Sequence, residues 1–110
     1  MTTAISQRGE ALLQLIGNTP LIPLTFEQED RTIWVKCEFL NPSGSIKDRL
    51  ARTIVQDARQ HNLLHADSII LECTSGNTGI AFAMIGAACG YGVSIVMSER
   101  ASGERRRIIQ

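Results

Sequence analysis

Three apolar segments in the second half of the chain constrain the fold more than any other feature. Residues 69–73 form a short, nearly continuous apolar run, typical of a strand buried on both faces. Residues 77–89 are apolar almost all round, which predicts an interior helix that ends at Gly90. Residues 93–97 predict another strand. This order indicates an α/β fold with a parallel sheet, because a helix crosses over between two parallel strands.

The remaining segments continue the alternation of strands and helices. We expect a strand at residues 32–39 and a helix that starts near Ser45 and fades by Asn62. The other expected segments are an amphipathic stretch at 5–15, a turn at 16–21, a charged loop at 27–31 and a helix from Glu104 onward.

The helix after Ser45 has a defined start and a predicted buried face. The Ser45 hydroxyl is expected to accept a hydrogen bond from the amide of Asp48, whose negative charge suits the first turn. The apolar side chains at four-residue spacing predict the buried stripe. They are Ile46, Leu50, Ile54 and Ala58.

Charge and hydropathy restrict the classes of partner. Eleven basic and eleven acidic residues cancel, which argues against nucleic acid or an acidic membrane as a partner. The arginines at 105–107 are interpreted as a solvated helix face offset by Glu99 and Glu104. The longest apolar run is interrupted by glycines and is too short to span a bilayer. We therefore expect no nucleic-acid and no membrane partner.

The cysteines indicate free thiols. Cys37, Cys73 and Cys89 are odd in number and lack CxxC spacing, and residues 1–7 do not resemble a secretory leader. This favours a reducing cytoplasm. Cys73, at the end of a predicted buried strand, is interpreted as a small apolar filler rather than a nucleophile.

The two histidines are spaced as metal ligands on a helix could be. His61 and His65 lie four residues apart, but Asn62 and Asp67 mark this stretch as the end of a helix. We therefore expect surface histidines and no metal site.

Lys47 lies where a solubilising charge is poorly placed. Residues 36–49 lead from an extended apolar run through a Pro/Ser/Gly turn, and Lys47 falls on the first turn of the following helix. The positive end of the helix dipole there favours a nucleophilic amine, which can form an imine with an aldehyde cofactor. A lone lysine at a helix terminus is more often a surface charge, so the surrounding residues must decide.

A second turn, at residues 74–79, also opens a helix. Its sequence Thr-Ser-Gly-Asn-Thr-Gly places hydroxyls and free amides at a helix N-terminus, where they can hold a carboxylate. Taken alone, the same turn can equally be a plain helix cap.

Together the two motifs resemble the pyridoxal-phosphate (PLP) enzymes of the cysteine synthase and cystathionine β-synthase family. The pattern Lys36-x-Glu38-x-x-x-Pro42-Ser43-x-Ser45-Ile46-Lys47-x-Arg49-x-Ala51 reproduces the family's lysine-attachment motif. Residues 16–21 look like its I-G-N-T-P-L segment, and residues 97–108 resemble its segment ending in S-x-E-R-R. The resemblance covers nearly the whole chain.

The resemblance implies a fold, a cofactor and roles for individual residues. The fold is the three-layer, tryptophan synthase β-like fold of type II PLP enzymes. Lys47 would bind PLP as an imine and act as the base at the substrate Cα, and Asn77 would hydrogen-bond the 3′ oxygen of the ring. The substrate carboxylate would be bound by Thr74, Ser75, Gly76 and Thr78.

The same resemblance also implies parts that these residues do not supply. The family's glycine-rich phosphate loop lies later in its chains, and Gln110 falls inside a predicted helix. We therefore expect residues 1–110 to be the N-terminal portion of one enzyme domain, which in the full-length family tends to form homodimers.

Several activities remain open. The first expectation is β-replacement on O-acetylserine or a similar activated serine with sulfide, which gives cysteine, in an enzyme of which residues 1–110 alone are expected to be inactive. Cystathionine β-synthase, serine or threonine dehydratase, and a non-catalytic truncated copy are the alternatives.

Overall fold

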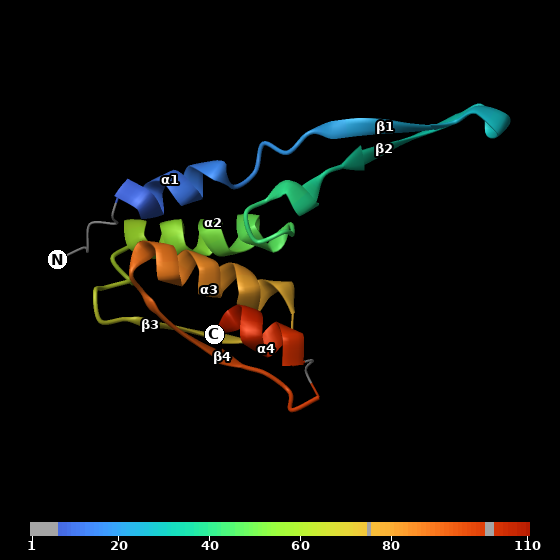
Figure 1. The fold of residues 1–110 in the computed structure, drawn as a ribbon. Coiled ribbons are helices and arrows are strands. Elements are labelled where there is room, and N and C mark those ends of the chain that lie inside the picture. The colour runs from blue at the N-terminus through green and yellow to red at the C-terminus, as the bar shows by residue number, and fades with distance from the viewer. Residues whose placement is uncertain (1–6, 75, 101–102) are drawn as a thin grey trace.

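The computed structural model describes residues 7–74, 76–100 and 103–110, and it shows a helical layer beside a small parallel sheet, with a long hairpin projecting from it (Figure 1). The elements follow one another as α1 (Gln7–Leu15), β1 (Leu21–Phe26), β2 (Arg31–Lys36), α2 (Lys47–Gln60), β3 (Ile69–Cys73), α3 (Asn77–Cys89), β4 (Gly92–Val96) and α4 (Gly103–Ile109). Short 3₁₀ turns occupy Glu27–Glu29 and Glu38–Leu40.

The βαβ unit predicted for the second half of the chain is confirmed. β3 and β4 pair in parallel, with Ile69 opposite Gly92 and Cys73 opposite Val96, and α3 is the crossover between them. Gly90 ends α3 in the left-handed conformation, with φ of 82°. The chain can therefore reverse its direction directly after α3 and begin β4 two residues after Gly90.

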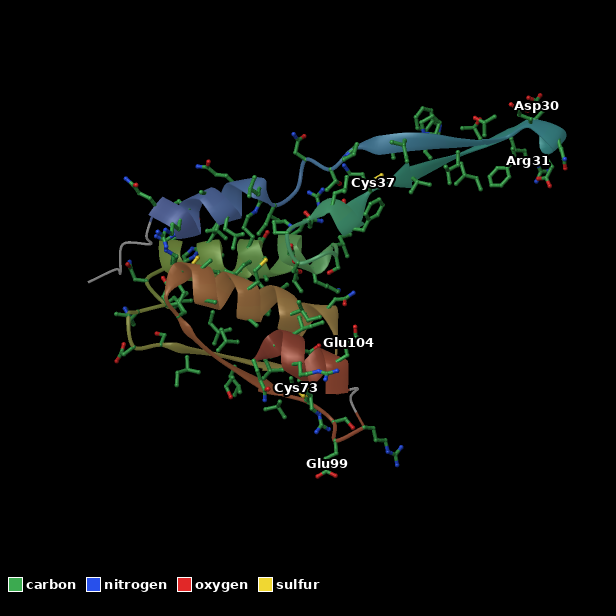
Figure 2. The ribbon with its side chains drawn as sticks, viewed as in Figure 1. Asp30, Arg31, Cys37, Cys73, Glu99 and Glu104 are labelled. Atoms are coloured by element: carbon green, nitrogen blue, oxygen red, sulfur yellow. The ribbon has the colours of Figure 1, made fainter. Side chains whose placement is uncertain are left out.

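The strand expected at residues 32–39 belongs to a different sheet from the one predicted. β2 pairs antiparallel with β1, and it ends at Lys36 because the chain turns into the 3₁₀ segment Glu38–Leu40. The connection between β1 and β2 is short, and a connection of this length can join only antiparallel strands. Its last residue, Asp30, has φ of 48°. Figure 2 shows Asp30 and Arg31 at the tip of this hairpin and Cys37 at its root.

The core lies between α1, α2 and α3, and α3 is its central element. The buried cluster consists of Leu13, Ile16, Ala51, Val55, Leu64, Ala81, Phe82, Ile85, Cys89 and Tyr91. On its other side α3 packs against β3 and β4 (Figure 1). Its all-round apolar sequence is explained by these two contacts.

The buried stripe predicted for α2 is wrong at three of its four positions, and the fourth, Ala58, is partly buried against the core. Ile46, Leu50 and Ile54 are 54%, 42% and 46% exposed. The face that packs on the core instead carries Ala51 and Val55, both buried. Small side chains let α2 approach α3 closely, and the larger aliphatic residues are left on the outer face.

β3 is not buried on both faces within the described structure, contrary to the prediction. Its side chains alternate, with Ile69 and Leu71 exposed and Ile70 packed against the core. The sheet has α3 on one face, and the described residues leave the other face open. Among those residues, no helix combines the length and the apolar character needed to cross a membrane.

Candidate active site

Lys47 is the first residue of α2, directly after a loop that is fastened to its surroundings. The Ser45 hydroxyl accepts a hydrogen bond from the Lys47 backbone N–H at 3.2 Å. The predicted bond from the Asp48 amide to this hydroxyl is wrong, because that amide donates to the Ser45 carbonyl oxygen at 3.4 Å. Ile46, the residue after Ser45, already has helical φ and ψ. The helical turn therefore starts too early for the predicted Ser45 cap to form.

Asp48 turns inward and is fully buried. Its carboxylate accepts hydrogen bonds from the Ser43 backbone N–H at 2.7 Å and from the Ser43 hydroxyl. Between them Gly44 adopts φ of 91°, a left-handed turn that favours glycine. A buried carboxylate must be met by polar hydrogens, so Asp48 fixes the loop in front of Lys47.

Glu38 and Arg49 form a two-pronged ion pair. Arg49 Nε and Nη2 donate to the two carboxylate oxygens of Glu38 at 2.8 and 3.0 Å. Thr19 Oγ1 and Asn41 Nδ2 each donate to the same carboxylate at 2.9 Å. Hydrogen bonding from Arg49, followed by Asn41 and Thr19, lowers the pKa of Glu38 from 4.5 to about 2, although desolvation acts to raise it.

The contact between Glu38 and Arg49 was not predicted from the sequence. Glu38 and Arg49 are both positions of the lysine-attachment motif, and their fixed spacing was the only signal in the sequence. Their contact joins the root of the hairpin to the first turn of α2.

The chain's two lysines have opposite environments. Lys36 donates from Nζ to the backbone carbonyl oxygen of Thr19, so its amine is engaged. Lys47 is exposed, and within the described residues its amine has no hydrogen-bond or ion-pair partner. It lines a shallow depression with Ile46, Arg49, Leu50 and Thr53. Of the two lysines, Lys47 is therefore the one whose amine is available for chemistry.

The loop at residues 74–79 joins β3 to α3. Thr74 extends the sheet by donating its N–H to the Val96 carbonyl oxygen at 2.9 Å, and its hydroxyl accepts from the Gly76 amide at 3.2 Å. The Gly76 carbonyl then accepts from the Gly79 amide at 3.1 Å and so begins the first turn. Ser75, also predicted to bind substrate, lies outside the described residues.

Asn77 and Thr78 are the first two residues of α3. Asn77 is exposed and Thr78 is half-buried. The first amides of a helix have no acceptor within it, so those of Asn77 and Thr78 can donate to an anion. Gly79 must be small here, because a Cβ at this position would lie 2.8 Å from Thr74 Cγ2.

The structure brings the two predicted motifs to the same end of the molecule. α2 and α3 pack side by side, and both helices begin at the end from which the hairpin projects (Figure 1). The loop before Lys47 also faces α3 across a pocket, which Pro42 and Ser43 line together with Ile80 and Met84.

The cysteines and histidines are spread over several elements of the structure. Cys73 is exposed at the end of β3, which corrects its interpretation as a buried filler. Cys37 and Cys89 are buried free thiols, and burial raises the pKa of Cys89. His61 and His65 are on the surface, as predicted. In the described part of the chain, no group of three or more His, Cys, Asp or Glu side chains could hold a metal ion.

These residues suit a cofactor that carries an aldehyde and a substrate that carries a carboxylate. An exposed amine without a partner is available for covalent attachment, and helix-terminal amides and hydroxyls are available for an anion. The side chain of Asn77 offers an amide donor beside them.

Comparison with known proteins identifies the family. The sequence profile described as "Pyridoxal-phosphate dependent enzyme" matches residues 12–110. A cysteine synthase from Flavobacterium sp. is 48% identical over 99 residues, which are 89% of this chain and 32% of that protein. An O-ureido-L-serine synthase from Streptomyces lavendulae is 46% identical over 101 residues, 91% of this chain and 31% of that protein. The chain thus spans about a third of the length of these relatives.

Solved structures agree with the sequence relatives. The crystal structure of O-ureido-L-serine synthase matches with a TM-score of 0.83 at 46% identity, over 89% of this chain and 31% of that one. A hydrogen sulfide-producing enzyme from Fusobacterium nucleatum matches with a TM-score of 0.85 at 38% identity, over 97% of this chain and 35% of that one. With a family profile that covers nearly all of its residues, this chain belongs to the pyridoxal-phosphate dependent enzymes, and cysteine synthases are among the relatives that it resembles.

Proposed function

We propose that residues 1–110 are the N-terminal portion of a cytoplasmic, homodimeric β-replacement enzyme that makes cysteine from an activated serine and sulfide. The single observation that carries the proposal is the free amine of Lys47, which stands at the start of α2. The anion-binding start of α3 lies at the same end of the molecule.

Lys47 has two tasks in this proposal. Its amine would hold the cofactor, and the same amine, when it is free, would take the Cα proton of the amino-acid substrate. When bound, PLP supplies an electron sink for the charge left on Cα. Acetate or a similar leaving group would depart from Cβ, hydrosulfide would add at that carbon, and the protonated Lys47 amine would return a proton to Cα.

The loop before α3 orients the substrate. Thr74, Ser75 and Thr78, together with the free amides of the first turn, bind the carboxylate of the amino acid. Asn77 donates to the 3′ oxygen of the cofactor ring. Gly76 leaves the approach open, since a Cβ there would have no atom within 4 Å.

The acceptor is the least constrained part of the proposal. Relatives include a cystathionine beta-synthase from Apis mellifera, 48% identical over 98 residues and matched over 19% of its length. This chain's residues serve the amino-acid half of the reaction, so homocysteine as acceptor is the second candidate. Dehydration of serine or threonine comes third.

The test is Lys47→Ala in the full-length protein, assayed with PLP, O-acetylserine and sulfide. We expect loss of cysteine formation and of the absorption band of the lysine-bound cofactor. Lys36→Arg is the matched control, because it removes the other lysine but keeps a charged donor for the Thr19 carbonyl. Cysteine formation that survives in Lys47→Ala overturns the proposal. A chain that binds no PLP at Lys47 and forms no product supports the non-catalytic alternative.

A further inference from the structure

Two side chains next to Lys47 in sequence anchor the first turn of α2. Asp48 is bonded to Ser43 in the preceding loop. Arg49 is bonded to Glu38 at the root of the hairpin. Successive residues of an α-helix are rotated by about 100°, so these three side chains leave the helix in three different directions. Because Asp48 and Arg49 are each bonded to a different part of the structure, the first turn of α2 cannot rotate. The direction in which the Lys47 side chain leaves the helix is therefore fixed as well.

The anchor at Arg49 is itself held on several sides. Glu38 accepts from Thr19 and Asn41 in addition to Arg49. Asn41 is buried, and its Oδ1 accepts from the Gly17 backbone N–H at 2.8 Å. Arg49 Nη2 also donates to Thr19 Oγ1 at 3.3 Å. The carboxylate thereby joins the turn before β1, the loop after β2 and the first turn of α2.

The shape of the contact requires arginine. A planar guanidinium meets both carboxylate oxygens at once, which fixes direction as well as distance, whereas a lysine ammonium is a point charge. Gly17 matches this geometry, because a Cβ at that position would lie 2.9 Å from Arg49 Nη1. The turn is thus shaped to receive the guanidinium edge.

We propose that Glu38 and Arg49 are positioning residues for Lys47. Their ion pair fixes the rotation of the first turn of α2, so that the Lys47 amine meets an aldehyde whose ring oxygen is held by Asn77. The inference rests on the proposed function, since it presupposes that Lys47 and Asn77 act on one cofactor. It adds a task for two residues of the lysine-attachment motif.

The experiment measures how fast Lys47 captures PLP in the purified full-length protein. Samples are quenched with borohydride at intervals, and the pyridoxyl group on the Lys47 peptide is quantified by mass spectrometry. We expect Arg49→Gln and Glu38→Gln each to slow capture by about threefold or more, and the double variant to be no slower than either single variant. Arg59→Gln is the matched control, because it breaks the ion pair with Glu10 near the other end of α2 and should leave capture unchanged.

A second comparison separates positioning from stability. Asn77→Ala should slow capture in the otherwise unaltered chain and have no further effect in the Arg49→Gln chain. If Arg49 only stabilised the fold, the effect of Asn77→Ala would be the same in both backgrounds. Circular dichroism checks that each variant is folded, and Arg49→Lys replaces Arg49→Gln if the latter is not.

Three results would overturn the inference. They are unchanged capture in folded Arg49 variants, an Asn77→Ala effect that persists in full without Arg49, and no capture by Lys47 in the unaltered chain. The proposed function fails separately, when Lys47→Ala retains cysteine formation.

Discussion

The folded structure favours the ionised form of the Glu38 carboxylate. Its pKa falls from 4.5 to about 2 on folding, mainly through hydrogen bonding from Arg49. A pKa lowered by folding adds stability that is fully present above pH 4.5 and is lost as the pH falls towards about 2. The ionised form is therefore the one that holds the hairpin root to α2.

We predict that the difference in unfolding free energy between the unaltered chain and Glu38→Gln depends on pH in this window. It should be constant above pH 4.5 and shrink steadily towards about pH 2. Urea unfolding followed by circular dichroism at a series of pH values measures it. The same substitution in an Arg49→Gln background is the control and should show a weaker pH dependence, because the main cause of the low pKa is gone. A difference that does not vary with pH would contradict the prediction.

Gly86 is a second residue whose identity is set by its surroundings. A Cβ there would lie 2.1 Å from Val93 Cγ2 and 3.2 Å from the Tyr91 carbonyl oxygen, so α3 and β4 can approach this closely only over a glycine. Gly86→Ala should destabilise the fold by about 1–3 kcal/mol through overpacking. Gly103→Ala, where no atom lies within 4 Å, is the control and should be neutral or stabilising by up to about 1 kcal/mol. Equal denaturation midpoints for the two variants would refute the argument.

At the scale of elements, the hairpin β1–β2 differs from the rest of the fold. All residues of β1 are exposed, and an isolated pair of strands is marginally stable in water. We predict that backbone amides of β1 and β2 exchange with solvent much faster than those of α3 around Phe82 and Ile85, which are buried. Hydrogen exchange read by mass spectrometry tests this. Equal protection in the two elements would show that the hairpin is covered by another surface in solution.

The sequence predicts elements well where local pattern and burial agree. The bounds of β3 and α3 match the predicted residues, because both are continuous apolar runs ended by turn residues. The partner of β2 and the buried face of α2 were not predictable in this way. Pairing depends on the return of the chain at Asp30, and the face of α2 depends on small residues fitting against α3.

In the candidate site, too, local features could be predicted from the sequence and contacts between distant segments could not. The places of Lys47 and the loop at 74–79 at the starts of two helices could be predicted from sequence, because turn residues and helix starts are local. The contact between Glu38 and Arg49 could not, since it forms only when the loop after β2 folds back on α2. Motif spacing identified the two residues without showing that they touch.

At the scale of the whole molecule, apolar side chains remain exposed on three surfaces. Trp34 and Leu24 lie on the hairpin, Leu50 and Ile54 on the outer face of α2, and Leu71 on the open face of the sheet. The molecule is also elongated, with extents of 59, 34 and 21 Å. Large exposed apolar patches are unusual for monomeric proteins and mark surfaces that bind other surfaces.

The outer face of α2 offers the sharpest test of this idea, because its aliphatic side chains repeat every four residues and so form one strip. We predict that the chain self-associates as its concentration rises, and that Leu50→Gln with Ile54→Gln raises the apparent Kd by about tenfold or more. Burying each aliphatic side chain contributes roughly 1 kcal/mol or more, and about 1.4 kcal/mol corresponds to a factor of ten. Sedimentation velocity over a concentration series measures the association.

Leu63→Gln is the matched control, since Leu63 is 72% exposed and lies in the turn after α2, outside the strip. It should leave the apparent Kd unchanged. If the double variant associates as the unaltered chain does, contact is made through the hairpin or the sheet instead, and Trp34 provides the means to distinguish these two surfaces. As the only tryptophan, it should shift its emission to shorter wavelength on association only when the hairpin is covered. A chain that stays monomeric at every concentration would contradict the prediction and would mean that none of the three surfaces binds a second copy of the chain.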